Sequence, residues 1–231
     1  MQDARVLVAG ASGDIGRAIA IELLQSGAAV LMLGRSRERL AAGRLPDSRH
    51  TPEYLALDLT DLVAVARAGA EIVGSGKLDA LVLSSGIYVR SQDPETFRRQ
   101  LDANLIGPYA LLQAILPILI ERKGQIIFVN SSQALSGAAG VGQYAATKHA
   151  AKAIADSLRA EVNERGVRVT SLYLGRTAGE RQREIFNMEG RPYHPESLIQ
   201  PCDVARTVIY LLQMPRTVEV TDVLMRPMQK V

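Results

Sequence analysis

The segment VAGASGDIG at residues 8–16 constrains the fold of this chain more than any other part of the sequence. Its first residues end the apolar run of residues 5–9, and its last residues begin the stretch 14–27, where isoleucine and leucine recur at helical spacing. Glycines at a strand-to-helix junction allow a tight turn and close approach of the backbone to a phosphate, and the free N–H groups of the helix start attract anions. The segment predicts a dinucleotide-binding loop, with a purely structural turn as the alternative. The loop residues expected at the cofactor are Gly10, Ser12, Gly13, Asp14, Ile15 and Gly16.

Apolar strand-like runs alternate with helix-like segments along the rest of the chain. Such continuously apolar runs are typical of parallel strands that helices cover on both faces. We therefore expect one α/β domain over residues 1–231, a three-layer, doubly wound parallel sheet (Rossmann fold) of about seven strands. The expected strands are residues 5–10, 28–34, 53–58, 79–86, 124–132, 167–175 and 220–228. The long polar stretch 176–200 is expected to be an irregular loop, either a functional lid at the substrate pocket or disordered.

Composition narrows the classes of protein to which the chain could belong. The net charge is +3 and the arginines are scattered without a dense basic run, so nothing supports nucleic-acid binding. The longest near-apolar run, residues 110–120, is too short for a membrane span, and the first residues lack the pattern of a secretory signal. Cys202 is the only cysteine, so no internal disulfide can form. We expect a cytoplasmic protein that binds neither nucleic acid nor membrane. We also expect no metal site, because no zinc-ligand spacing occurs.

The end of the second expected strand bears on the choice of dinucleotide. In this fold an acidic residue at that point favours NAD(H), whereas an arginine accommodates the 2′-phosphate of NADP(H). Here the sequence is LGRSRER, in which Arg35 follows the strand directly and no acid occupies the strand end. We expect NADP(H), with NAD(H) less favoured, and with Arg35 as the main contact and Ser36 as a second. The alternative is that Arg35 is a solvated residue at the start of a helix.

The segment QYAATK places Tyr144 four residues before Lys148 in an alanine-rich, helix-like run. Positions i and i+4 share a face of a helix, so the phenol and the ammonium would point the same way. A nearby ammonium stabilises a phenolate, which would suit Tyr144 to proton transfer. The pair alone is weak support for a function, because it can arise by chance.

Taken together, these motifs resemble the short-chain dehydrogenase/reductase family over essentially the whole chain. The likeness rests on their order as well as their content, with Tyr144 placed twelve residues after Ser132. The motifs are the glycine loop at 10–16, Asp58 after the third strand, SSG at 84–86, DANLIG at 102–107, VNSS at 129–132, YAATK at 144–148 and YLGRT at 173–177. The resemblance implies an oxidoreductase in which a nicotinamide cofactor exchanges hydride with a small ketone, aldehyde or alcohol.

The resemblance also implies a catalytic set of Asn104, Ser132, Tyr144 and Lys148. Tyr144 would exchange a proton with the substrate oxygen, Ser132 would bond that oxygen, and Lys148 would tune Tyr144 and bond the nicotinamide ribose. Asn104 would order a water that links the lysine to solvent. Two alternatives stay open: Ser131 in place of Ser132, and an Asn104 side chain that only bonds backbone.

Further cofactor contacts are implied by the same resemblance. They are Asp58, Leu59, Ser84, Ser85, Gly86, Gly175 and Thr177, together with Tyr144 and Lys148 themselves. Asp58 would meet the adenine ring unless it caps the next helix. Thr177 would bond the nicotinamide amide unless it simply lies in the loop. For association, the apolar segment 103–121 and the alanine-rich segment 143–155 imply a homodimer or homotetramer.

The chain departs from the family pattern at several places. Asp14 stands where the commonest glycine loop has its second glycine, the fourth strand ends in Leu83-Ser84-Ser85-Gly86, and Leu174 precedes Gly175 in place of proline. None of these departures removes a catalytic group. A non-catalytic dinucleotide sensor on the same fold is the competing interpretation, and the intact set of Asn104, Ser132, Tyr144 and Lys148 argues against it. Lyase or epimerase chemistry is disfavoured because no second domain for a sugar nucleotide is evident.

Overall fold

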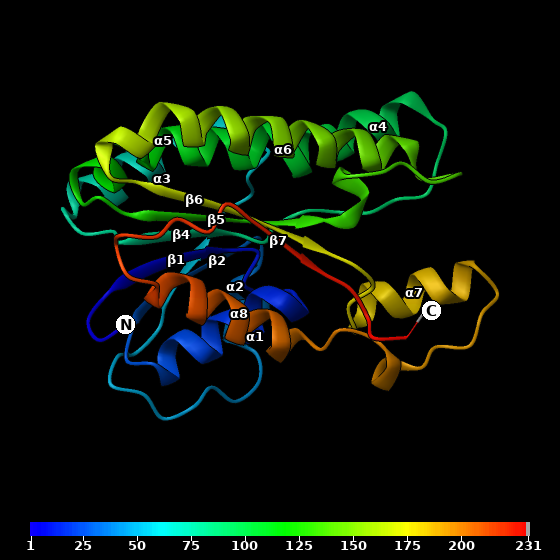
Figure 1. The fold of residues 1–231 in the computed structure, drawn as a ribbon, viewed down its shortest axis with the longest axis horizontal. Helices are drawn as coiled ribbons and strands as arrows, with labels where there is room; N and C mark the ends of the chain where they lie inside the picture. The colour runs from blue at the N-terminus through cyan, green and yellow to red at the C-terminus, as the bar shows by residue number, and fades with distance from the viewer. Residues whose placement is uncertain (230–231) are drawn as a thin grey trace.

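The computed structural model describes residues 1–229, which contain one parallel sheet of seven strands in the order β3-β2-β1-β4-β5-β6-β7. Figure 1 shows this sheet between two layers of helices. The strands are β1 (Arg5–Ala9), β2 (Ala29–Gly34), β3 (Glu53–Ala56), β4 (Ala80–Leu83), β5 (Gln125–Ser131), β6 (Arg168–Leu174) and β7 (Asp222–Met225). The prediction of a three-layer, doubly wound sheet of about seven strands is confirmed.

Four helices cover one face of the sheet and three cover the other (Figure 1). The first layer is α3 (Leu62–Gly74), α4 (Pro94–Leu101), α5 (Gly107–Glu121) and α6 (Gly142–Val162). The second layer is α1 (Asp14–Gln25), α2 (Arg37–Ala41) and α8 (Pro201–Gln213). Because β1 and β4 lie between these layers, every side chain of β4 is buried. This burial explains why the strands read as continuous apolar runs.

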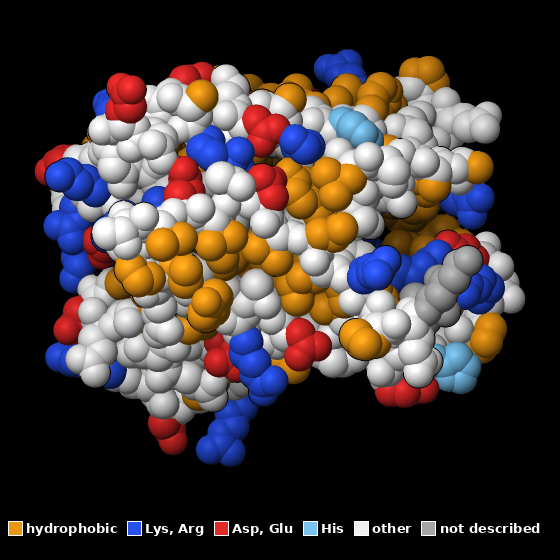
Figure 2. Space-filling model, in the orientation of Figure 1, with side chains coloured by type: hydrophobic (Ala, Val, Ile, Leu, Met, Phe, Trp, Pro, Cys, Tyr) orange, Lys and Arg blue, Asp and Glu red, His pale blue; other side chains and the backbone are white. Residues whose placement is uncertain are grey.

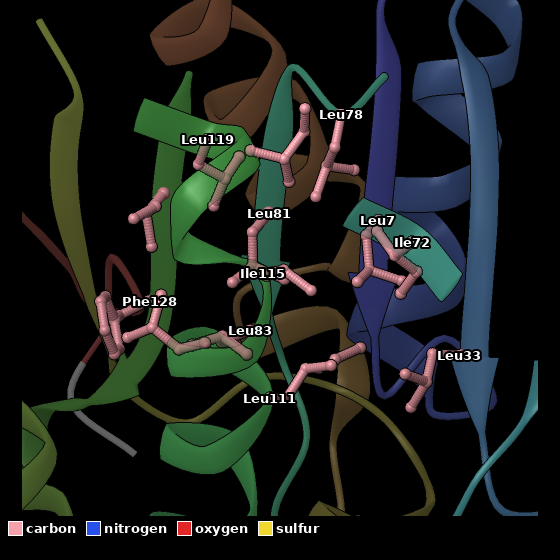
Figure 3. Close-up of a cluster of buried hydrophobic side chains, with 14 of the residues drawn as sticks. Leu7, Leu33, Ile72, Leu78, Leu81, Leu83, Leu111, Ile115, Leu119 and Phe128 are labelled. Carbon is pink, nitrogen blue, oxygen red and sulfur yellow. The ribbon is translucent and has the colours of Figure 1, made fainter. Parts of the chain in front are cut away.

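The larger core lies between the sheet and the helices α3, α5 and α6. Leucine and isoleucine side chains from alternate strand positions interdigitate there with the inner faces of the helices (Figure 3). Leu7 and Leu81 belong to adjacent strands in matched register, and Leu111 and Ile115 meet them from α5. The four side chains are fully buried. The core therefore fixes the height of α5 over the sheet.

A π-helical turn, Asp102–Ile106, joins α4 to α5, so residues Pro94–Glu121 form one helical rod of 28 residues. By length and composition alone this rod could cross a membrane, so the expectation that its apolar part is too short does not hold. However, 44% of its apolar window is buried inside the fold. A helix at the core of a globular protein has the same properties, because its inner face packs against other elements.

The stretch 176–200 is not irregular, which corrects the expectation from the sequence. It contains the helix α7 (Glu180–Met188) and a 3-10 turn at Pro195–Ser197. Figure 1 shows α7 set apart from the two helical layers, beside the carboxyl edge of the sheet. A small separate core of Ala178, Phe186 and Leu198, with Tyr193 packed against it, holds the stretch together. We refer to residues 176–200 as the lid.

The helices α3 and α5 touch through residues without side-chain bulk, which generates a first prediction. A Cβ added to Gly69 would lie 2.4 Å from Cβ of Ala114, whereas one added to Gly74 of the same helix would meet nothing within 4 Å. We expect Gly69→Ala to lower the free energy of unfolding by about 1–3 kcal/mol through overpacking. Gly74→Ala should leave it unchanged or raise it slightly, because alanine favours helix. Urea unfolding of both variants is the measurement, and equal midpoints would contradict this account of the contact.

Candidate active site

A cleft of about 420 Å³ opens at the carboxyl ends of the strands. The glycine loop, the ends of β4 and β5, the start of α6 and the lid all contribute to its walls. Predicted residues that the fold brings together here are Gly10, Gly13, Asp14, Ile15, Gly16, Ser84, Ser85, Ser132, Tyr144, Lys148, Gly175 and Thr177. Residues of the predicted set that lie outside its walls are Ser12, Arg35, Ser36, Asp58, Leu59, Gly86 and Asn104.

The glycine loop packs backbone against backbone on the end of β4. Gly10 has φ +85°, and a Cβ at this position would lie 2.6 Å from the backbone nitrogen of Ser85. A Cβ on Gly16 would lie 2.3 Å from the carbonyl oxygen of Gly10. Ser84 strengthens the junction, since its hydroxyl donates to the carbonyl of Ala9 at 2.6 Å. Only glycine fits at these two positions. Residues 13–16, at the start of α1, line the cleft, and the free N–H groups of a helix start attract anions.

Tyr144 and Lys148 lie in the first two turns of α6 and both line the cleft. The ammonium Nζ of Lys148 is 5.6 Å from the centre of the Tyr144 ring, and the lysine side chain is 7% exposed. The two groups thus share a face of the helix, as their spacing predicts.

Tyr88 is a site residue that the sequence reasoning missed. Its ring meets the Tyr144 ring edge to face at a centroid distance of 5.1 Å, and it lines the same cleft. Burial raises the pKa of the Tyr88 phenol, so this second hydroxyl stays protonated. Tyr88 follows the SSG motif by two residues, but no pattern around it marks it as functional. Only the fold places it against Tyr144.

Asn104 is 4% exposed and lies in the π-helical turn between α4 and α5. Its Oδ1 accepts from the backbone N–H of Ile87 at 2.6 Å, and its Nδ2 donates to the carbonyl of Ile87 at 2.9 Å and to Oγ1 of Thr147 at 3.2 Å. The side chain therefore bonds both the backbone of Ile87 and the side chain of Thr147. It ties the segment after β4 to α6, one residue from Lys148.

The end of β5 supplies two serines to the cleft. The strand ends at Ser131, whose Oγ accepts from the backbone N–H of Gln133 at 3.2 Å and caps a short 3-10 turn. Ser132 begins that turn, and both serines line the cleft, so the choice between them stays open. Asn130 was not predicted as a site residue. Its Nδ2 donates to the carbonyl of Lys148 at 3.1 Å, and its Oδ1 accepts from the N–H of Ser131 at 2.9 Å.

The expected adenosine end of the site lies past β2. Arg35 is exposed directly after this strand, and no ion pair among residues 1–229 includes it. Ser36 caps α2 by accepting from the N–H of Arg39 at 3.2 Å, and it donates to Glu38 at 2.7 Å. This hydrogen bond lowers the pKa of Glu38. The Ser36 side chain is thus engaged within the helix start, while Arg39 lines the cleft.

Asp58 and Thr177, two other residues predicted to contact the cofactor, form hydrogen bonds to residues close to them in the chain. Asp58 accepts from both the N–H and the hydroxyl of Thr60 at 2.9 Å, whereas Asp61 caps α3 through the N–H of Ala64. Leu59 is a core residue rather than a wall of the cleft. Thr177 donates to the carbonyl of Gly175 at 3.1 Å and lies at the base of the lid. These bonds neither require nor exclude a cofactor contact.

The lid adds an ion pair to the far wall of the cleft. Nη2 of Arg176 bonds both carboxylate oxygens of Glu189 at 2.8 and 2.9 Å. The Arg176 guanidinium also stacks on Phe186 at 4.8 Å from the ring centre. Among residues 1–229 no group of three or more histidine, cysteine or carboxylate side chains could hold a metal ion. The chemistry that these walls offer is proton transfer beside an anion-attracting loop.

Comparison with known proteins agrees with this arrangement. The family described as short chain dehydrogenase matches residues 4–190. A Bos taurus protein called dehydrogenase/reductase SDR family member 7B is 34% identical over 189 residues, which is 76% of this chain but 58% of the length of that relative. An uncharacterized short-chain type dehydrogenase/reductase of Sinorhizobium fredii is 32% identical over 96% of this chain and 90% of its own length. A solved alcohol dehydrogenase from Thermococcus sibiricus, complexed with 5-hydroxy-NADP, is 24% identical with a TM-score of 0.83 and covers 100% of this chain and 99% of its own.

The three hydrogen bonds of Asn104 generate a second prediction. We expect Asn104→Ala to lower the free energy of unfolding by about 1–3 kcal/mol, because it leaves the partly buried N–H and carbonyl of Ile87 without partners. Asn163→Ala removes an exposed side-chain bond to Glu219 and should change stability by about 0.5 kcal/mol or less. Chemical unfolding of the two variants gives the comparison. If both behaved alike, the tie between the β4 end and α6 would not contribute to stability.

Proposed function

Because this chain belongs to the short-chain dehydrogenase/reductase family of oxidoreductases, we propose that it interconverts a small ketone or aldehyde and the corresponding alcohol with NADP(H). The observation that carries the proposal is the pairing of Tyr144 with the buried Lys148 on the face of α6 that lines the cleft, opposite the glycine loop. A dinucleotide sensor would need the loop but not a phenol and its ammonium partner. The proposed substrate is a small molecule that fits between α6 and the lid.

The residues present fit a bound dinucleotide. The cradle formed by Gly10 and Gly16 would be filled by any Cβ, and the hydroxyl of Ser85 is buried on the cleft wall with no hydrogen-bond partner among residues 1–229. The loop would hold the pyrophosphate at the start of α1. For NADP(H), Arg35 stands at the end of β2 with no acid at the strand end, and Arg39 lies one helical turn further on. The structurally similar alcohol dehydrogenase from Thermococcus sibiricus is complexed with 5-hydroxy-NADP, which supports this choice of cofactor.

In the proposed mechanism Tyr144 is the general acid and base. It donates its proton to the substrate carbonyl oxygen during reduction and takes a proton back during oxidation. The cofactor, when bound, supplies or accepts the hydride at the substrate carbon. Lys148 stabilises the phenolate that forms when Tyr144 gives up its proton. A serine at the end of β5, Ser132 or its neighbour Ser131, holds the substrate oxygen. Asn104 contributes by fixing α6 against the segment after β4, next to Gly86.

We also propose that the protein is a cytoplasmic homo-oligomer, a dimer or a tetramer. Ile106 and Tyr109, at the junction of the π-helical turn with α5, are each 43% exposed. A second apolar region lies along the edge of the sheet beside β7 and α8 (Figure 2). It includes Tyr210, 64% exposed, and Leu224, 59% exposed. Apolar surface of this kind supports association with a second copy.

The proton-transfer role of Tyr144 is tested by removing its hydroxyl. We expect Tyr144→Phe to lower kcat with NADPH by about 10²- to 10⁴-fold, the usual contribution of a general acid. The Kd for NADPH should change little, because the hydroxyl acts on the substrate. Tyr210→Phe is the matched control, since it removes the hydroxyl of an exposed tyrosine on α8, outside the walls of the cleft. A Tyr144→Phe enzyme that kept more than about a tenth of its activity, or a control equally impaired, would show that the acid is another group.

The choice of cofactor is tested at Arg35. A charge-assisted bond to the 2′-phosphate contributes about 1.5–3 kcal/mol, or roughly ten- to 150-fold in preference for NADPH. Arg35→Asp should reverse the preference, because a carboxylate repels the phosphate and accepts bonds from ribose hydroxyls. Arg39→Ala tests the second arginine on its own. It should lower the preference for NADPH less than Arg35→Asp does. The measurement is the ratio of kcat/KM with NADPH and NADH. A wild type that prefers NADH, or a ratio that Arg35→Asp does not move, would overturn the assignment.

A further inference from the structure

The first turn of α7 is bound to the rest of the protein at two adjacent residues. Oδ2 of Asp14, in the glycine loop, accepts from the backbone N–H of Glu180 at 2.9 Å. The guanidinium of Arg181 donates to the carbonyl oxygen of Gly86, just beyond β4. These contacts join segments that are 166 and 95 residues apart in the chain. Neither contact was expected from the sequence.

Both contacts end where a dinucleotide would lie. Asp14 begins α1 after β1, and Gly86 follows β4, the strand that pairs with β1 at the centre of the sheet. In a doubly wound fold the cofactor lies across the carboxyl ends of such strands. Glu180, Arg181 and Gln182 line the same cleft as the glycine loop. The first turn of α7 therefore lies over the cofactor cleft.

The contact at Asp14 also explains why an acid is tolerated in a phosphate-binding loop. Helix α7 begins after Gly179, which has no side chain to cap it, so the Asp14 carboxylate takes the position of a capping group. Gly179 has φ +149°, and a Cβ there would lie within 2.2 Å of Oδ2 of Asp14. The glycine thus makes room for the carboxylate, which is directed toward the lid.

We propose that Asp14 and Arg181 are positioning residues that hold the lid closed across the cleft, so that the cofactor enters and leaves only when both contacts open. The inference rests on the proposed function for the identity of the cofactor, NADP(H). Capping interactions of this kind change helix stability by about 0.5–2 kcal/mol, which corresponds to roughly two- to thirtyfold in the population of the open lid.

The N–H of Glu180 can be removed without disturbing the helix. Glu180 is the first residue of α7, where proline is well tolerated, and Gly179 before it has ψ 176°, outside the α region that a following proline disfavours. Glu180→Pro deletes the donor, and Glu180→Ala is the matched control that keeps it. In the cofactor-free protein we expect amide hydrogen exchange in residues 183–188 to be about two- to thirtyfold faster in Glu180→Pro than in Glu180→Ala. Exchange in α5 should be the same in both.

Substitutions of Asp14 test the same contact from the other side. Asp14→Ala should speed exchange in residues 183–188, whereas Asp14→Asn should restore the wild-type rate, because its amide oxygen can accept the same bond. Release of NADPH, followed by stopped-flow fluorescence, should be faster by a similar factor in Asp14→Ala and Glu180→Pro. Arg181→Ala should add to either effect.

The outcomes separate this proposal from the proposed function. Lid exchange that is unchanged in both Asp14→Ala and Glu180→Pro would overturn the role of the contacts, and so would faster exchange with unchanged NADPH release. A wild type that does not bind NADPH would instead overturn the choice of cofactor, while the exchange experiment would still decide whether the contacts hold the lid. The variants lie on different elements, so a folding defect in one leaves the other as the test.

Discussion

The site depends on a close contact between two backbones, the glycine loop and the end of β4. At Gly10 no side chain fits between the chain leaving β1 and residues 84 and 85. Because β1 and β4 are paired in parallel, both chains leave the sheet at the same edge and must pass one another there. The contact fixes where α1 begins, and therefore where its free N–H groups point. It also sets the path of residues 84–88, which carry Ser85 to the cleft and bring Tyr88 against Tyr144.

The two sides of the cleft are held with different strength. Helix α6 is fixed by buried bonds, from Asn104 to Thr147 and from Asn130 to the carbonyl of Lys148. The lid is joined to the glycine loop by an exposed carboxylate, Asp14, and has a core of only a few residues. Exposed bonds and small cores open at lower free energy than buried ones. The cleft thus has one wall, α6, that is anchored by buried hydrogen bonds and another, the lid, that is anchored by exposed ones.

The sequence predicted the sheet well because its central strands, such as β4 and β6, are buried on both faces, which leaves a continuous apolar signal. It did not predict α7, because that helix packs on a core of its own rather than on the sheet, and its outward residues are charged. It also did not show that residues 94–121 form one rod, since Asp102 and Asn104 interrupt the apolar pattern. Asn104 is tolerated there because its amide bonds are satisfied by Ile87 and Thr147, which are distant in the chain.

The sequence by itself determined the local geometry of the site. The spacing of Tyr144 and Lys148 follows from the helical repeat, and the glycine positions follow from a strand-to-helix turn. Tertiary structure alone decided which distant groups meet them. It directed the Asp14 carboxylate to the start of the lid helix and set Tyr88 beside Tyr144. The physical reason is that a pattern reports the period of one element, whereas a contact between elements depends on how the whole sheet and its helices pack.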